Sequence, residues 1–308
     1  MSKEIVVFTH NDLDALGCML NIEYKMPNVK KKYFHTNYSN IPKIVDEILD
    51  YMNSHDIHFI LIPDVSFATH KEFLTTLYET GKPIIHIDHH LYPDGFWDDY
   101  PNMRVVWDKT KSATKLCNEY FGNTGKNANL DKLTDIIDAY DLWRVDSPYF
   151  GVAQDFNNYF WEVGIEWLCN EIVSRDFKLP ENFRAIVDNF NWRCKNTIQY
   201  YEDSKKIMRS GPVTFSLTNE FFNQINLKEM ENGQQVVIGI NDYGIVRCRL
   251  NQKSIFTDEQ INDIRFKITG EKDTGHKHAF TFKIDIKSAN DAFAEVQRIA
   301  KILQNYLT

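Results

Sequence analysis

The sequence predicts an α/β protein built on a parallel sheet with helices on both faces, followed by a smaller α/β domain. Three observations lead to this fold class. Short apolar runs rich in β-branched residues alternate with stretches of helical periodicity through the first half of the chain. Strict alternation of strand and helix is typical of parallel strands joined by right-handed crossovers. The chain of 308 residues also exceeds what one hydrophobic core usually supports, so two domains are expected.

The first half of the chain supplies five predicted strands with helices between them. The strands are expected at residues 5–8, 32–35, 57–62, 83–87 and 103–106, and the helices at residues 15–24, 41–52, 67–79 and 113–121. A further helix at residues 130–143 carries Asp138 and Asp141 in its last turn. A helical stretch rich in aromatic residues then runs from residue 156 to about residue 209 and is interrupted at Pro180.

The carboxyl-terminal part alternates in the manner of strands. The predicted strands are residues 213–217, 235–240, 244–250, 263–268 and 279–286, and residues 290–307 predict a closing amphipathic helix. Asn241-Asp242-Tyr243-Gly244 is a turn signal for a hairpin. We therefore expect a domain at residues 1–185, a helical linker at residues 186–211 and a smaller α/β domain at residues 212–308.

Composition and charge limit the classes of partner. The formal net charge of −8 argues against a broad basic surface for long duplex nucleic acid, so a short substrate fits better. The five cysteines are odd in number and scattered, as expected of reduced thiols in the cytosol. No segment resembles a signal peptide, and no run approaches the roughly 20 apolar residues of a membrane helix. We expect a soluble cytoplasmic protein without a membrane partner.

Three metal-competent side chains follow the first apolar run. His10, Asp12 and Asp14 stand at alternate positions, and alternate side chains of an extended segment point the same way. They can therefore converge at the carboxyl end of the strand predicted at residues 5–8. Ligands of open α/β sheets bind at this edge.

Other acidic and imidazole side chains are expected at the same edge. Asp64 follows the third apolar run, Asp88-His89-His90 ends the fourth, and Asp138 and Asp141 share one face of a helix. Mixed imidazole and carboxylate ligation suits Mn²⁺ better than Mg²⁺, which is the alternative. Two such ions about 3.5–4 Å apart would activate a water and stabilise charge on a phosphoryl group. The predicted chemistry is phosphoester hydrolysis.

These segments, in this order, resemble the four motifs of the DHH phosphoesterase superfamily. The motifs are His10-Asn11-Asp12-Leu13-Asp14-Ala15-Leu16-Gly17, Pro63-Asp64, Asp88-His89-His90 and Asp138-Ala139-Tyr140-Asp141-Leu142-Trp143. Gly275-His276-Lys277-His278-Ala279 is similar to the glycine-histidine motif of the DHHA1 domain, the usual partner. Within the superfamily the chain most resembles the nano-RNase B-type oligoribonucleases, through its first motif, Lys111-Ser112-Ala113-Thr114 and Tyr140-Asp141-Leu142-Trp143.

The resemblance implies a role for each motif residue. Asp88 would orient the neighbouring imidazoles, and His90 would contact the scissile phosphate. Asp138 is the alternative to Asp141 as a metal ligand, and the Tyr-Asp-Leu-Trp sequence favours Asp141. The implied ligands are His10 and Asp12 for a first metal ion, Asp14, His89 and Asp141 for a second, and Asp64 as the bridge between them.

The second domain departs from the family pattern. Thr274 stands where the family has a glycine before its histidine, and Thr281 where it has a glycine after the alanine. Because glycine permits close backbone approach to a phosphate, these changes would reshape the substrate pocket. Arg265 and His276 are the expected contacts to the far end of a nucleotide chain, since an arginine fork matches phosphate oxygens.

The resemblance implies a two-metal phosphodiesterase of the exonuclease type that hydrolyses RNA of a few nucleotides to 5′-mononucleotides. A phosphatase for 3′-phosphoadenosine 5′-phosphate, or a phosphodiesterase for cyclic or linear dinucleotides, would use the same metals with a different second domain. A pyrophosphatase is disfavoured because the second domain lacks a lysine- and arginine-rich clamp. An inactive nucleotide-binding regulator is the remaining alternative, and the presence of every proposed ligand weighs against it.

Overall fold

The computed structural model describes residues 4–218, 220–241, 243–251, 256–270, 279–285 and 289–306. The chain divides into two compact units, Met1–Phe190 and Asn191–Thr308, and the boundary falls within helix α8 (Phe183–Asp203). In the described ranges, no helix combines the length and the apolar character needed to cross a lipid bilayer.

The first unit contains the predicted parallel sheet. In its described part the strand order is β2-β1-β3-β4-β5, and each neighbouring pair is parallel. All of the strands predicted for this half of the chain are confirmed, with small shifts at their ends. They are β1 (Glu4–His10), β2 (Lys30–Thr36), β3 (Ile57–Pro63), β4 (Ile84–Asp88) and β5 (Arg104–Trp107).

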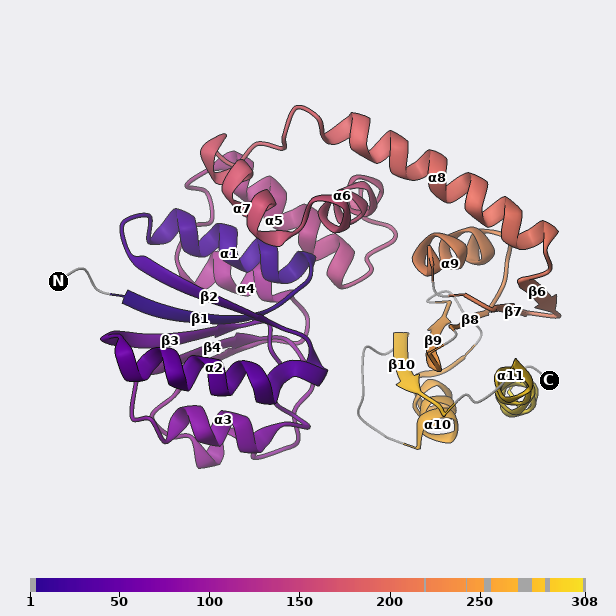
Figure 1. Ribbon diagram of the computed structural model, residues 1–308, viewed down its shortest axis with the longest axis horizontal. Coiled ribbons are helices and arrows are strands. Elements are labelled where there is room, and N and C mark those ends of the chain that lie inside the picture. Colours follow the sequence, from indigo (N-terminus) through magenta and orange to yellow (C-terminus); the bar gives the residue numbers. More distant parts are fainter. Residues whose placement is uncertain are drawn as a thin grey trace. The chain divides into compact units, whose positions relative to one another are not determined.

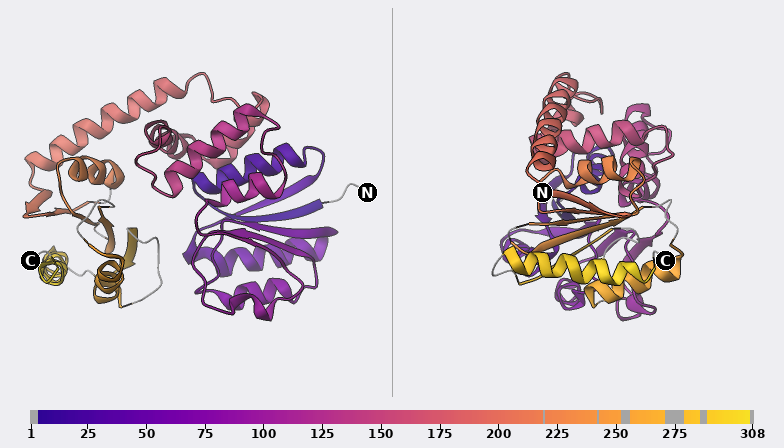
Figure 2. Two further views of the ribbon diagram at one scale, coloured as in Figure 1. Left: turned by 180° about the vertical axis from the view of Figure 1, so that it is seen from behind. Right: turned by 90° about the vertical axis from the view of Figure 1, so that its right-hand side faces the viewer.

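Helices cover both faces of this sheet, as expected (Figures 1 and 2). Ile5 and Val7 of β1 pack towards α1 and α4, whereas Val6 and Phe8 pack towards α2 and α3. This alternation follows from the two-residue period of a strand, and it explains why the whole run is apolar. One face carries α1 (Leu13–Lys25), α4 (Ala113–Tyr120), α5 (Ala128–Asp141), α6 (Phe150–Val163) and α7 (Ile165–Ser174), and the other carries α2 (Ile41–Ser54) and α3 (Lys71–Tyr78).

The parallel arrangement brings separate chain segments to one edge of the sheet. β1 ends at His10, β4 ends at Asp88, and Asp64 directly follows the last residue of β3. Because parallel strands share one direction, these three positions lie at the same carboxyl edge. The helix α1 begins at Leu13, so Asp14 is helical, and the extended segment expected to carry His10, Asp12 and Asp14 ends before Asp14.

The second unit contains a mixed sheet with the order β10-β9-β8-β7-β6 in its described part. β7 and β8 are parallel, the other neighbouring pairs are antiparallel, and β8 and β9 form the predicted hairpin. β6 lies at the end of the stretch predicted to be helical up to about residue 209, so the helix predicted there is wrong, and α9 has no counterpart among the predicted elements. The elements are β6 (Ile207–Ser210), β7 (Val213–Ser216), α9 (Phe222–Glu231), β8 (Val236–Ile240), β9 (Ile245–Leu250), α10 (Asp258–Thr269), β10 (Ala279–Lys283) and α11 (Ala289–Gln304).

Residues 263–268 belong to α10, so the strand predicted there is wrong. Thr257 and Gln260 form a capping box, in which each side chain accepts the backbone N–H of the other residue. Gly270 ends the helix in the left-handed conformation that favours glycine. A six-residue apolar pattern is too short to distinguish a strand from a helix, and the helical period appears only over the longer set of buried side chains, Ile261, Ile264 and Ile268.

Candidate metal centre

Residues from all four motifs come together at the carboxyl edge of the first sheet. They form three overlapping groups, within each of which the potential ligand atoms lie within 4.8 Å of one another. Asp64 and His89 each belong to two of these groups, so the groups make one continuous cluster. The groups are His10, Asp12 and Asp64; Asp14, His89 and Asp141; and Asp64, Asp88, His89 and His90.

His10 and Asp12 lie where β1 passes into α1. Nδ1 of His10 lies 2.7 Å from Oδ2 of Asp12, and Oδ1 of Asp12 accepts the backbone N–H of Ala15 at 3.0 Å. Asp12 is therefore the N-cap of α1, and the beginning of that helix fixes its side chain. Burial opposes the ionisation of Asp12, but the adjacent His10 lowers its pKa overall.

Asp14, His89 and Asp141 come from α1, the segment after β4 and the end of α5. Nε2 of His89 lies 3.7 Å from Oδ2 of Asp14 and 3.4 Å from Oδ2 of Asp141. The two carboxylate oxygens of Asp14 accept the backbone N–H groups of Ala113 and Thr114, each at 2.8 Å. These donors begin α4, where the helix dipole also favours a negative charge. The start of α4 thus holds Asp14 in place.

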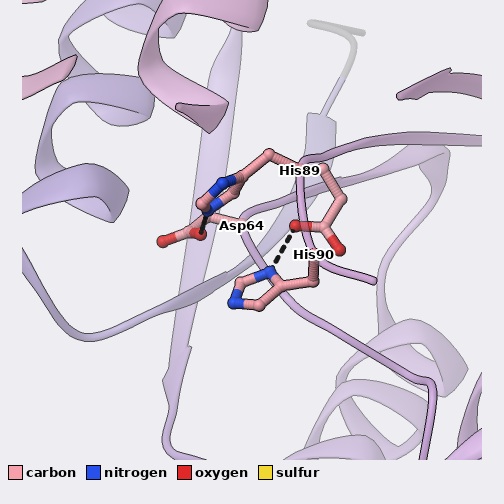
Figure 3. Close-up of side chains that lie close together, drawn as sticks. Asp64, His89 and His90 are labelled. Carbon is pink, nitrogen blue, oxygen red and sulfur yellow. Dashed lines mark hydrogen bonds and ion pairs between the residues drawn. The ribbon is translucent and has the colours of Figure 1, made fainter. Parts of the chain in front are cut away.

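Asp64 connects the groups. Its backbone φ of 58° lies in the left-handed region, which aspartate tolerates better than most residues, and its N–H donates to the carbonyl of Ile87 at 3.0 Å. Its Oδ1 lies 3.7 Å from Nε2 of His89 (Figure 3). A backbone in this region that is held by strand pairing is frequent at functional sites.

Asp88 and His90 form a hydrogen-bonded pair beside the cluster. Asp88 is fully buried and accepts from Nδ1 of His90 at 2.7 Å and from the hydroxyl of Tyr92 at 2.5 Å. Burial raises the pKa of Asp88, but the neighbouring imidazoles, first of all His90, lower it overall, so the carboxyl stays ionised. In Figure 3, His89 points to Asp64 whereas His90 lies to one side of it. The neighbouring imidazoles therefore face different partners.

The structure brings Asp141, and not Asp138, to the cluster. Oδ1 of Asp138 accepts the backbone N–H of Ser112 at 2.9 Å, and Oδ2 pairs with Nε of Arg144 at 3.0 Å. Ser112 is itself the N-cap of α4, since its hydroxyl accepts the N–H of Lys115 at 3.2 Å. Asp138 therefore connects α5 to the beginning of α4.

The carboxylates of the cluster disfavour one another's charge. Burial, followed by the charges of Asp12 and Asp14, raises the pKa of Asp64 well above its ordinary value. Burial also raises the pKa of Asp141, although His89 opposes this shift. Within the described residues, Oδ2 of Asp64 and Oδ2 of Asp141 are buried without a hydrogen-bond partner. Buried carboxylate oxygens that lack a hydrogen-bond partner and lie next to imidazoles are ligands that suit a divalent cation.

Of the two residues expected to contact the far end of a substrate, only Arg265 lies within the described residues. Arg265 lies on α10 with only 2% of its surface exposed, which does not favour contact with a phosphate, and its role stays a prediction. Thr281 lies in β10. His276 and Thr274 fall outside the described residues.

Two aromatic residues next to His90 are absent from the sequence-based candidates. The hydroxyl of Tyr38 lies 3.1 Å from Nε2 of His90, and Nε1 of Trp107 donates to the carbonyl of His90 at 2.7 Å. Trp107 is the last residue of β5 and so ends at the same edge as the motifs. Asp64 was identified because it follows a predicted strand, and the same reasoning could have identified Trp107. No local signal in the sequence marks Tyr38.

Comparisons with known proteins identify the fold. No family model and no curated protein matches the sequence. Among solved structures, exonuclease RecJ bound to manganese aligns over 98% of this chain and 90% of its own, with 14% identity and a TM-score of 0.60. RecJ from Thermus thermophilus, in complex with Mn²⁺, aligns over 98% of this chain and 52% of its own, with 14% identity and a TM-score of 0.63.

A third similar structure is PggH from Vibrio cholerae, a pGpG-specific phosphodiesterase. It aligns over 97% of this chain and 99% of its own, with 14% identity and a TM-score of 0.57. The chain therefore shares the fold of RecJ and PggH, and the α/β fold class predicted from the sequence is confirmed.

Proposed function

We propose that this chain is a divalent-metal-dependent phosphodiesterase that hydrolyses short RNA oligonucleotides to 5′-mononucleotides. The observation that carries the proposal is the position of Asp64, which shares one ligand group with His10 and Asp12 and another with His89. A carboxylate between two adjacent ligand groups is the arrangement expected of a two-metal hydrolase. The manganese bound to RecJ, which has the same fold, supports the choice of metal.

The overlapping ligand groups support separate places for two divalent cations. Mn²⁺ suits the mixed ligands better than Mg²⁺, and two bound ions would supply an activated water and offset charge on the phosphoryl group. The residues proposed to hold them are His10 and Asp12 for one ion, Asp14, His89 and Asp141 for the other, and Asp64 for both.

His90 is the proposed contact to the scissile phosphate. Asp88 accepts the Nδ1–H of His90, which fixes the orientation of the ring and leaves Nε2 on the opposite side. Nε2 lies 3.1 Å from the Tyr38 hydroxyl and is the atom proposed to contact a phosphate oxygen. Asp88 is thus proposed as a positioning residue that acts through His90.

The net charge of −8 supports a short substrate, because long nucleic acid requires an extended basic surface. The proposed partner is an oligonucleotide or dinucleotide rather than long duplex nucleic acid. Residues 212–308 are proposed as a DHHA1-like substrate-binding domain. A second candidate function is hydrolysis of linear dinucleotides, because PggH, which acts on pGpG, matches nearly the whole of both chains.

Product analysis tests these proposals directly. End-labelled RNA and DNA of graded short lengths, pGpG, and a long duplex would each be incubated with Mn²⁺, Mg²⁺ or EDTA, and the products separated. We expect metal-dependent release of 5′-mononucleotides from short RNA and none from the duplex. Turnover of pGpG alone would favour the dinucleotide phosphodiesterase. Failure to cleave any diester in the presence of Mn²⁺ would refute both functions.

A further inference from the structure

Three large apolar side chains are exposed next to His90, and we call them the His90 rim. Tyr38 is 38% exposed, Leu91 is 47% exposed, and Trp107 is 45% exposed. Scattered exposed apolar residues are normal on a protein surface and need no explanation. These three residues differ because each is connected to His90. Tyr38 lies within hydrogen-bond distance of the His90 side chain, Trp107 donates to the His90 carbonyl, and Leu91 follows His90 in the chain.

The two aromatic rings of the rim are held in place by their polar atoms. Nε1 of Trp107 donates to the His90 carbonyl at 2.7 Å, and the Tyr38 hydroxyl lies 3.1 Å from Nε2 of His90. The Tyr38 ring also packs against the ring of His10, with 5.4 Å between centroids. Because the polar atoms are already engaged, the exposed parts of both side chains are the apolar ring surfaces. Rigid aromatic surfaces of this kind bind unpaired bases by stacking.

We propose that Tyr38 and Trp107 form a stacking surface for the nucleobase next to the scissile phosphate. The inference rests on the proposed function, since it takes His90 as the phosphate contact. A phosphate at His90 brings its own nucleoside close to the rim, whereas pyrophosphate or a sugar phosphate has no group that these rings would bind. Stacking also supplies affinity that does not depend on charge.

The surface is expected to select for nucleotides without reading their sequence. Every base has a π-face, so stacking tolerates any base and favours the larger purines modestly. The substrate class is therefore a single-stranded nucleotide or oligonucleotide with an accessible base. A base paired within a duplex would not be available to either ring.

The binding of 5′-AMP and of ribose 5-phosphate tests the proposal, because the two probes differ only in the base. Both would be titrated into the full-length protein in the presence of Mn²⁺, with calorimetry as the readout. We expect wild-type protein to bind 5′-AMP at least about ten-fold more tightly. Trp107→Ala should weaken 5′-AMP binding about 5- to 100-fold and leave ribose 5-phosphate unchanged.

Three further variants test the ring of Tyr38 apart from its hydroxyl and control for the loss of an exposed aromatic side chain elsewhere. Tyr38→Phe keeps the ring and should preserve the preference for 5′-AMP, whereas Tyr38→Ala should reduce it. Trp161→Ala removes another tryptophan of the first unit, 59% exposed on α6, and should change neither affinity. Thermal melting of each variant would show that it is folded.

The outcomes of this experiment distinguish the stacking surface from the proposed function. Equal wild-type affinity for the two probes, or equal losses on both in Trp107→Ala, would overturn the stacking surface even if the protein cleaves oligonucleotides. A base-dependent affinity that Trp107→Ala removes would support the surface. That result would stand if no diester is cleaved, and the phosphodiesterase function alone would then be rejected.

Discussion

Asp64 combines a buried charge with a left-handed backbone, and one substitution separates the two properties. Asparagine tolerates φ near 58° about as well as aspartate, so Asp64→Asn removes the charge without new backbone strain. Loss of a residue that only hydrogen-bonds to a metal ligand typically weakens metal affinity roughly 10–100-fold. We expect Asp64→Asn to weaken Mn²⁺ affinity by more than this, because both ligand groups lose a ligand atom. Calorimetric titration of Mn²⁺ measures this, and an unchanged affinity would contradict the bridging role.

Asp138 and Asp141 provide a matched pair of carboxylates on one helix. Asp141→Asn should lower Mn²⁺ affinity and turnover strongly, because its Oδ2 lies in the cluster. Asp138→Asn should cost about 1 kcal/mol of stability through weaker bonds to Ser112 and Arg144, with little change in Mn²⁺ affinity. Metal titration and thermal melting of both variants would check this ranking, and the reverse order would assign the ligand role to Asp138.

At the scale of elements, the close packing of α1 against α4 positions Asp14. Thr114 of α4 donates its hydroxyl to the carbonyl of Asp14 at 2.8 Å, in addition to its N–H bond to the carboxylate. A Cβ added at Gly17 would lie 2.0 Å from Oγ1 of Thr114 and 2.8 Å from Cδ1 of Ile137. Only glycine therefore permits this approach of the two helices.

Gly17→Ala is expected to push α4 away from α1. We predict a loss of about 1–3 kcal/mol of stability from overpacking, together with a roughly 10–100-fold weaker Mn²⁺ affinity. Gly151→Ala on α6 is the control, because its added Cβ would meet no heavy atom within 4 Å. Chemical denaturation and metal titration would measure both effects. A Gly17→Ala protein with normal Mn²⁺ affinity would show that α4 does not position Asp14.

At the scale of the whole molecule, the metal cluster couples stability to pH. Burial raises the pKa values of Asp14, Asp64 and Asp141 in the folded state. Such a carboxyl group is harder to ionise in the folded state than in the unfolded state, where its pKa is about 3.9. Its contribution to stability is present below that pH and is lost as the pH rises through the pKa of the folded state. Without metal, the cluster should therefore destabilise the protein increasingly above about pH 4.

Metal binding is expected to reverse this loss. Mn²⁺ at about 100 times its Kd adds about 2.7 kcal/mol, which corresponds to a rise in Tm of roughly 5–10 °C for a unit of this size. The rise should be larger at pH 7.5 than at pH 5, because protons compete with the metal for the same carboxylates. Thermal melts with Mn²⁺ or EDTA at both pH values measure this. An equal rise in the Asp64→Asn protein would contradict binding at the cluster.

Much of the fold and most of the cluster could be predicted from local patterns in the sequence. The apolar runs of β1, β3 and β4 mark parallel strands, and parallel strands end at one edge, so the motif residues after them had to meet there. The second unit was predicted less well. Residues 263–268 are helical and not a strand, since a short apolar window does not distinguish the two periods when the caps at Thr257 and Gly270 are overlooked.

The sequence by itself determined which segments carry the chemistry, because strand and helix periodicity depends on neighbouring residues. The Tyr-Asp-Leu-Trp sequence favours Asp141 over Asp138, but only the tertiary structure shows that Asp138 is bonded to Ser112 and Arg144 instead. It likewise placed Tyr38 and Trp107 on His90. The end of β5 marks Trp107 as a residue of this edge, but its bond to His90, like that of Tyr38, joins residues far apart in the chain and is set by packing.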